Sequence, residues 1–66
     1  MKIIQVSFFR DQQHLSSVHI PETLLPNGTT GEIVVAARAL ARSIAKPRKG
    51  DSWCSSVGGE LWAGYF

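Results

Sequence analysis

Cysteine is almost missing from this chain. Cys54 is the only one among 66 residues, so no disulfide can form within the chain. Small secreted domains usually depend on several disulfides. The single thiol therefore indicates a reducing compartment, and we expect a cytoplasmic protein. One cysteine also leaves the usual zinc motifs incomplete.

Long apolar runs are missing as well. No stretch approaches the ~20 apolar residues of a membrane span. The first apolar run is interrupted at once by Gln5 and Ser7. We therefore expect neither a signal peptide nor a membrane partner.

Recognisable catalytic and cofactor motifs are not found either. The five carboxylates are scattered, and the glycines match neither a phosphate-binding loop nor a dinucleotide fingerprint. His14 and His19 are five residues apart on a predicted strand, so we expect them on opposite faces, unable to share a metal. Cys54 is interpreted as an inert thiol. The sequence thus predicts no catalytic residue, no metal site and no cofactor, and we expect that the protein is not an enzyme.

Two segments near the N-terminus alternate with the two-residue period of a half-buried strand. Residues 2–9 and 14–20 each carry apolar side chains at every second position, and residues 10–13 form a polar connection. Pro21 lacks an amide hydrogen and closes the second strand. We therefore expect a β-hairpin.

Residues 29–46 carry the pattern of a capped helix. Thr29 and Glu32 have capping-box spacing, and Pro47 disfavours helical geometry in the residue before it. One stripe at helical spacing is apolar, and we expect it to face the core. Its members are Ile33, Ala37, Leu40, Ala41 and Ile44.

A second hairpin is predicted after the helix. Gly58 and Gly59 separate two strand-like runs, and both positions of a two-residue turn require positive φ. In this register Trp53 lies opposite Gly64, a strand glycine that the indole can cover. The order strand, strand, helix, strand, strand predicts a single α+β domain, residues 1–66, with an antiparallel sheet of about four strands and one helix on one face.

One helix leaves the second face of such a sheet uncovered. The predicted pairing divides the second hairpin between two faces. One face carries Trp53, Val57, Trp62 and Phe66, and the other carries Cys54, Leu61, Ala63 and Tyr65. Two interpretations remain open. The helix rests on the Cys54 side and leaves the tryptophans outward as interface anchors, or the tryptophans simply form the core.

Basic residues are concentrated in one segment. The net charge of +2 is too small to indicate a nucleic-acid partner by itself. Arg38 and Arg42 are one helical turn apart, and Lys46 continues the same stripe. This stripe is either a solvated helix face or a docking site for phosphates or an acidic protein surface. Five of the seven basic residues lie within twelve positions: Arg38, Arg42, Lys46, Arg48 and Lys49.

Strand 2–9, capped helix 29–46 and the hairpin from Trp53 to Phe66 together resemble the small proteins of phages and mobile elements, of which the anti-CRISPR inhibitors are the best known. The resemblance implies a non-enzymatic protein that blocks a larger partner by steric occupation, in the cytoplasm of a bacterial host if a phage encodes it. Several such inhibitors are acidic mimics of nucleic acid. This chain is basic, which favours docking on an acidic protein surface or a nucleoprotein.

Three hypotheses follow. The first is a binding protein that inhibits or modulates a larger protein or nucleoprotein partner. The second is direct nucleic-acid binding, with basic residues on phosphates and a tryptophan stacked on bases. The third is a homo-oligomer, such as a dimer, that buries its open sheet face against a copy of itself. The predicted partner-binding residues are Arg38, Arg42, Lys46, Arg48, Lys49, Trp53, Trp62 and Tyr65.

Overall fold

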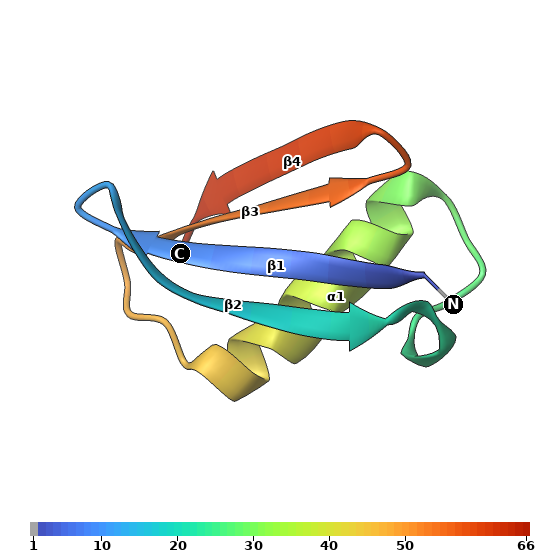
Figure 1. Cartoon of the computed structure of the whole chain (residues 1–66), viewed down its shortest axis with the longest axis horizontal. Coiled ribbons are helices and arrows are strands. Elements are labelled where there is room, and N and C mark those ends of the chain that lie inside the picture. Colours follow the sequence, from blue (N-terminus) through green and yellow to red (C-terminus); the bar gives the residue numbers. More distant parts are fainter. Residues whose placement is uncertain (1) are drawn as a thin grey trace.

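A computed structural model describes residues 2–66 as one sheet with a helix across it (Figure 1). The order of the long elements is ββαββ, which confirms the predicted α+β fold. The elements are β1 (Ile3–Arg10), β2 (Gln13–Pro21), the one-turn 3₁₀ helix η1 (Glu22–Leu24), α1 (Thr30–Ala45), β3 (Ser52–Val57) and β4 (Glu60–Tyr65).

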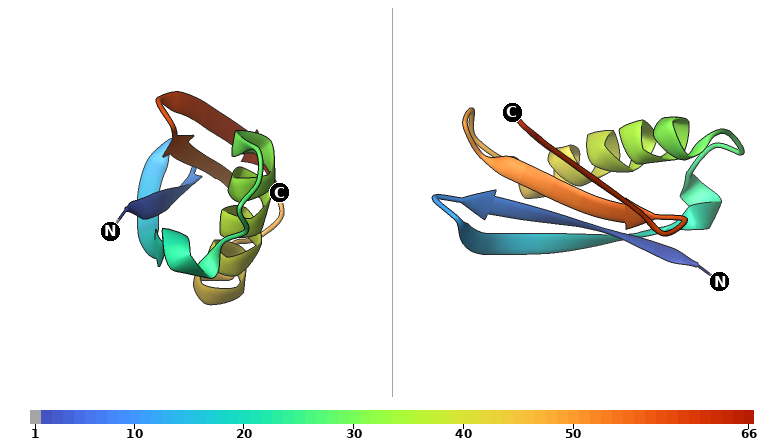
Figure 2. Two further views of the ribbon diagram at one scale, coloured as in Figure 1. Left: turned by 90° about the vertical axis from the view of Figure 1, so that its right-hand side faces the viewer. Right: turned by 90° about the horizontal axis from the view of Figure 1, so that it is seen from above.

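The strand order in the sheet, which the sequence does not reveal, is β2-β1-β3-β4, with every neighbouring pair antiparallel. The connection that contains α1 therefore carries the chain from the edge strand β2 across β1 to β3. Figure 2 shows the result as two layers, with α1 on one face of the sheet and the other face open. We call these the helix face and the open face.

The β1–β2 ladder contains a β-bulge at which Leu15 has no partner in β1. His14 pairs with Phe9, and His19 pairs with Gln5. Because the extra residue changes the alternation of the strand, both histidines lie on the open face. The prediction that they lie on opposite faces was wrong, since it assumed an unbroken two-residue period.

Helix α1 begins and ends as its flanking residues predict. The Thr29 hydroxyl oxygen accepts the backbone N–H of Glu32 at 3.3 Å, and the Thr29 hydroxyl donates to the Glu32 carboxylate at 3.2 Å. At the other end Lys46 adopts left-handed geometry and donates its N–H to the Arg42 carbonyl at 2.9 Å. Capping thus limits the helix to the segment before Pro47.

The buried stripe of α1 differs from the predicted one. Val34, Ala37 and Ala41 are buried, whereas Leu40 and Ile44 are exposed. Apolar residues occupy more than half of the helix circumference, so the spacing alone does not locate the centre of the buried side. The small Ala37 and Ala41 allow the helix axis to approach the sheet closely, and this packing determines the rotation of the helix.

Trp53 lies beneath the helix, with 8% of its surface exposed. The interpretation in which the helix rests on the Cys54 side and both tryptophans face outward is therefore wrong for Trp53. The buried hydrophobic residues form one cluster between α1 and the sheet. They are Ile4, Val6, Phe8, Ile20, Leu25, Val34, Ala37, Ala41, Trp53 and Val57.

The predicted pairing of Trp53 with Gly64 is confirmed. A Cβ atom added at Gly64 would lie 2.9 Å from the indole nitrogen of Trp53. The indole therefore occupies the volume that any side chain at Gly64 would need. By contrast, a Cβ atom at Gly31 would lie no closer than 3.7 Å to its nearest neighbour, an ordinary contact.

We expect Gly64→Ala to lower the free energy of unfolding by about 1–3 kcal/mol, because the new methyl group displaces the buried indole of Trp53. The matched variant Gly31→Ala should leave stability unchanged or raise it by up to about 1 kcal/mol, since alanine favours helix. Urea denaturation followed by tryptophan fluorescence measures both. Equal stability of the two variants would contradict the observed packing.

Candidate functional site

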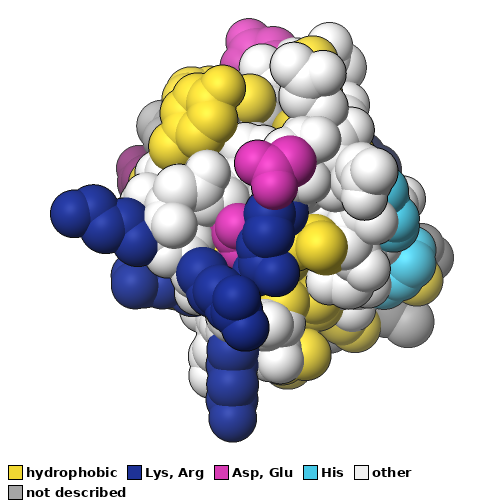
Figure 3. Space-filling view, turned by 90° about the vertical axis from the view of Figure 1, so that its left-hand side faces the viewer, with side chains coloured by type: hydrophobic (Ala, Val, Ile, Leu, Met, Phe, Trp, Pro, Cys, Tyr) yellow, Lys and Arg dark blue, Asp and Glu magenta, His cyan; other side chains and the backbone are white. Residues whose placement is uncertain are grey.

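Lysine and arginine side chains gather at the end of the molecule that carries the β1–β2 turn and the loop after α1 (Figure 3). Lys2 lies at the opposite end of β1. We call the remaining basic residues the basic end. They are Arg10, Arg38, Arg42, Lys46, Arg48 and Lys49.

Asp51 is buried at the centre of the basic end. Its carboxylate accepts two hydrogen bonds from Arg10, one from Nε at 2.8 Å and one from Nη2 at 2.9 Å. This bidentate geometry is typical of arginine. The backbone N–H of Arg48 donates to the same carboxylate at 2.9 Å. The hydrogen bonds from Arg10 and then from Arg48 lower the pKa of Asp51 to about 2, against the opposing effect of burial.

The backbone of Asp51 holds the last described residue in place. The N–H of Phe66 donates to the carbonyl of Asp51, and the N–H of Gly50 donates to the carbonyl of Phe66, both at 2.9 Å. The Phe66 ring stacks on the buried Phe8, with centroids 5.9 Å apart. Phe66 is thereby fixed on the helix face, beside Trp53.

Arg38 and Arg42 extend from α1 over these aromatic rings. The guanidinium carbon of Arg38 lies 4.5 Å from the centroid of Phe66 and 5.6 Å from that of Trp53, and that of Arg42 lies 5.4 Å from Phe66. Such cation–π contacts orient the charges and restrict their motion. Arg38 is half-buried against these rings, whereas Arg42 remains exposed.

The basic loop lies directly after the helix. Lys46, Arg48 and Lys49 are exposed, and the only ion pair within residues 2–66 is the one between Arg10 and Asp51. Acidic residues of this part of the chain therefore do not neutralise the loop. Its charge remains open to an external anion.

An apolar groove between α1 and β4 adjoins the arginines. Trp62 forms one wall and is 37% exposed, and Val35 forms the other and is 66% exposed. Val35 is three residues before Arg38, so the two are neighbours on the helix surface. Gly31 leaves room for the indole of Trp62. The groove is lined by Thr29, Gly31, Glu32, Val35, Ala36, Ala39 and Trp62.

The structure brings most of the predicted site residues together but separates two. Arg38, Arg42 and Trp62 share the helix-face side, and the basic loop continues from them. Trp53 is a core residue beneath Arg38, and it supports the site without being accessible. Tyr65 is exposed on the open face, away from the groove.

Val35 and Phe66 belong to the site but were not predicted. Adjacent Val34 and Val35 on a helix cannot both face the sheet, and this was the available signal for an exposed valine. For Phe66 the signal was the register of the second hairpin, which places it on the face of Trp53. Its hydrogen bonds with Asp51 and Gly50 do not follow from that register.

The open face carries a hydrogen-bonded row of polar side chains. His14 Nε2 and the Ser17 hydroxyl are 2.8 Å apart, the hydroxyls of Ser17 and Ser7 are 3.0 Å apart, and Gln5 donates to Ser7 at 3.3 Å. Each serine is held by its neighbours in the row. No carboxylate takes part in these contacts to orient His14. The Ser7–Ser17 contact joins β1 to β2, and the other two contacts lie within one strand each.

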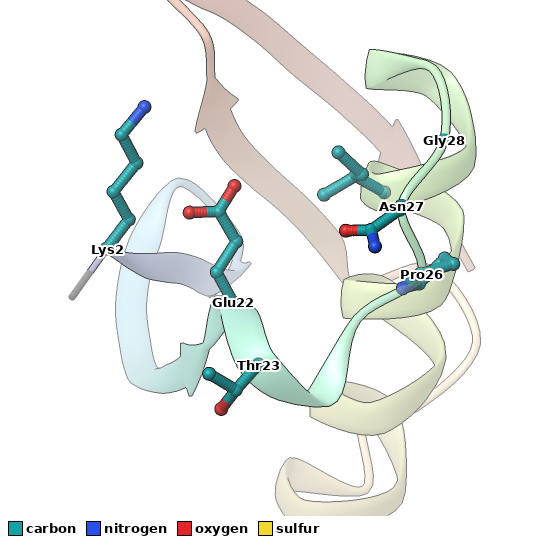
Figure 4. A pocket seen from close by; sticks show the side chains of 7 residues that line it. Lys2, Glu22, Thr23, Pro26, Asn27 and Gly28 are labelled. Atoms are coloured by element: carbon teal, nitrogen blue, oxygen red, sulfur yellow. The ribbon is translucent and has the colours of Figure 1, made fainter.

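A further pocket lies between the start of β1, η1 and the loop before α1 (Figure 4). Lys2 and Glu22 provide its charges, and Asn27 lies on the opposite wall. The described lining contains neither histidine nor cysteine. Its remaining described lining residues are Thr23, Pro26, Gly28 and Ile33.

Two further features are absent from residues 2–66. No group of three or more His, Cys, Asp or Glu side chains in this part of the chain is placed to hold a metal ion. Among its helices, none has both the length and the apolar character needed to cross a membrane.

Comparisons with known protein families, curated proteins and solved structures give no match for this chain.

We expect Asp51→Asn to be less stable than the wild type at pH 7, because the uncharged amide cannot form the ion pair with Arg10. The stabilisation by Asp51 is fully present above its unfolded pKa, near 3.8, and is lost as the pH falls through its folded pKa of about 2. The stability difference between the two proteins should therefore shrink between about pH 4 and pH 2. Thermal denaturation across this range measures it, and a constant difference would refute the role of the charge.

We also expect Arg38→Gln to lower the free energy of unfolding by about 0.5–2 kcal/mol, because it removes a cation from two aromatic rings. Lys49→Gln, which changes an exposed side chain in the basic loop, should alter stability by less than about 0.5 kcal/mol. Urea denaturation compares the two. Equal effects would show that the aromatic contacts of Arg38 contribute no stability.

Proposed function

We propose that this protein is a non-catalytic binding protein that docks on an acidic surface of a larger protein or nucleoprotein and inhibits or modulates it by steric occupation. One observation carries the proposal. The apolar groove, the two ring-supported arginines and the basic loop form one continuous strip along α1. The nearest buried acid, Asp51, is already paired with Arg10.

The composition of the strip favours a protein partner over free nucleic acid. Trp62 and Val35 provide apolar area next to Arg38 and Arg42, and aromatic residues and arginine are the types that dominate protein interfaces. A phosphate-binding surface needs cations but no aliphatic groove beside them. We infer that the partner presents carboxylates beside apolar side chains.

The dimensions of the molecule support steric occupation as the proposed mode of action. The body measures 33 × 21 × 17 Å and displays the strip along its helix. A standard interface buries about 800 Å² of each partner, and the bound protein excludes other molecules from that area. This is the mode implied by the resemblance to anti-CRISPR inhibitors. The same resemblance and the single thiol of Cys54 lead us to propose a cytoplasmic location.

The test uses a labelled helical peptide of glutamate and leucine as a defined acidic, apolar probe, at low salt. We expect the double variant Arg48→Glu/Lys49→Glu to weaken binding about tenfold or more, because each reversal replaces attraction by repulsion. Trp62→Ser should weaken it by a similar factor through loss of the groove wall. Fluorescence anisotropy measures both.

The controls are one charge reversal and one apolar-to-serine change away from the strip. Lys2→Glu alters charge at the far end of β1, and Leu24→Ser removes an exposed apolar side chain in η1; both should leave affinity within about twofold. Losses as large as those of the strip variants would contradict the proposal. So would tighter binding of a single-stranded DNA oligonucleotide, with a steep log-linear dependence on salt, which is the behaviour of a nucleic-acid-binding protein.

A further inference from the structure

The two edges of the sheet are protected unequally. The β2 edge is interrupted by the bulge at Leu15 and ends in Pro21, and both features hinder the addition of another strand. The other edge, β4, pairs with no element of residues 2–66 on its outer side (Figure 1). It contains neither bulge nor proline, and its only charged residue is its first, Glu60.

The turn geometry determines which backbone groups of β4 point outward. Gly58 and Gly59 have positive φ, as in a two-residue hairpin, so Val57 and Glu60 form the hydrogen-bonded pair that flanks the turn. Hydrogen-bonded and non-bonded pairs alternate along antiparallel strands. The odd-numbered residues of β4 form the non-bonded pairs with β3, and they therefore direct their N–H and C=O groups away from β3. These residues are Leu61, Ala63 and Tyr65.

We propose that β4 pairs antiparallel with β4 of a second copy of this chain, about a two-fold axis at Ala63. In this register Ala63 faces Ala63 of the copy, and Leu61 faces Tyr65 in both directions. All three outward residues then form hydrogen-bonded pairs, with two backbone hydrogen bonds in each. A shift of the register by two residues in either direction sets one of the three against a position outside β4.

The side chains are complementary in the same register. Leu61 and Tyr65 are 74% and 79% exposed on the open face, and pairing makes them cross-strand neighbours. On the helix face Glu60 comes to lie opposite Phe66 of the copy, the ring over which Arg38 and Arg42 hold their charges. One acidic residue thus meets two cations at each end of the shared ladder.

This inference goes beyond the proposed function and does not depend on it. The ladder shares Trp62, Arg38 and Arg42 with the strip, whereas Lys46, Arg48 and Lys49 belong to the loop after α1 and lie outside the ladder. Two six-residue strands bury little area, so we expect a weak dimer that forms between about 10 µM and 1 mM. Sedimentation equilibrium covers this concentration range.

A cysteine cross-link tests the register. In a Cys54→Ser background, Ala63→Cys places two thiols across the two-fold axis, at the Cα separation of about 5.5 Å that a disulfide accommodates. Leu61→Cys is the matched control, because each such cysteine lies about 13 Å from its own copy in this register. We expect mild oxidation to yield the covalent dimer at least about tenfold faster for Ala63→Cys. Equal rates for the two variants would overturn the register.

A second pair of variants locates the contact. Leu61→Lys puts a charge on the open β4 edge and should abolish the dimer in sedimentation equilibrium, whereas Leu15→Lys, the equivalent change on β2, should leave it intact. Both side chains are exposed, so both variants should fold. A wild type that remains monomeric at about 1 mM, or a dimer weakened by Leu15→Lys as much as by Leu61→Lys, would overturn the proposal.

Discussion

The structure depends on the ion pair between Arg10 and Asp51. Arg10 is the last residue of β1, and Asp51 immediately precedes β3, so their two hydrogen bonds close the end of the central β1–β3 ladder. Asp51 also accepts the N–H of Phe66, and Phe66 in turn lies beneath Arg38 and Arg42. Asp51 thus links the end of the sheet to the placement of the surface arginines through two different groups. Its carboxylate binds Arg10 and the backbone N–H of Arg48, and its backbone carbonyl holds Phe66.

The second constraint is geometric, since this chain carries more apolar side chains than one helix and one sheet face can bury together. Ala37 and Ala41 bring the helix close to the sheet, while Val35, Leu40 and Ile44 remain at the surface. The sheet repeats this excess on its open face. The groove beside Trp62 and the apolar edge of β4 are both consequences, and both lie next to charges that restrict which partners fit.

Our predictions from the sequence succeeded where the determining interactions are local. The Thr29–Glu32 cap and the register set by Gly58–Gly59 depend on residues a few positions apart. They failed where one extra residue in a strand, or the rotation of the helix about its axis, changes which side chains face the core. The bulge at Leu15 brought both histidines to one face, and close packing rather than periodicity selected Val34 over Leu40 for the core. The candidate site was recovered as a basic segment with Trp62, but Val35 and Phe66 were missed.

The sequence by itself determined the order and type of the long elements, the ends of the helix, the C-terminal hairpin and the clustering of its cations. Each of these follows from neighbours along the chain, through backbone geometry and hydrogen bonds that form within a few residues. Only the tertiary structure decided the strand order, the covered face of the sheet, the partner of Asp51 and the rings beneath Arg38. These features arise from contacts between segments some 40 to 50 residues apart along the chain. Packing in three dimensions selects among arrangements that local preferences leave equal.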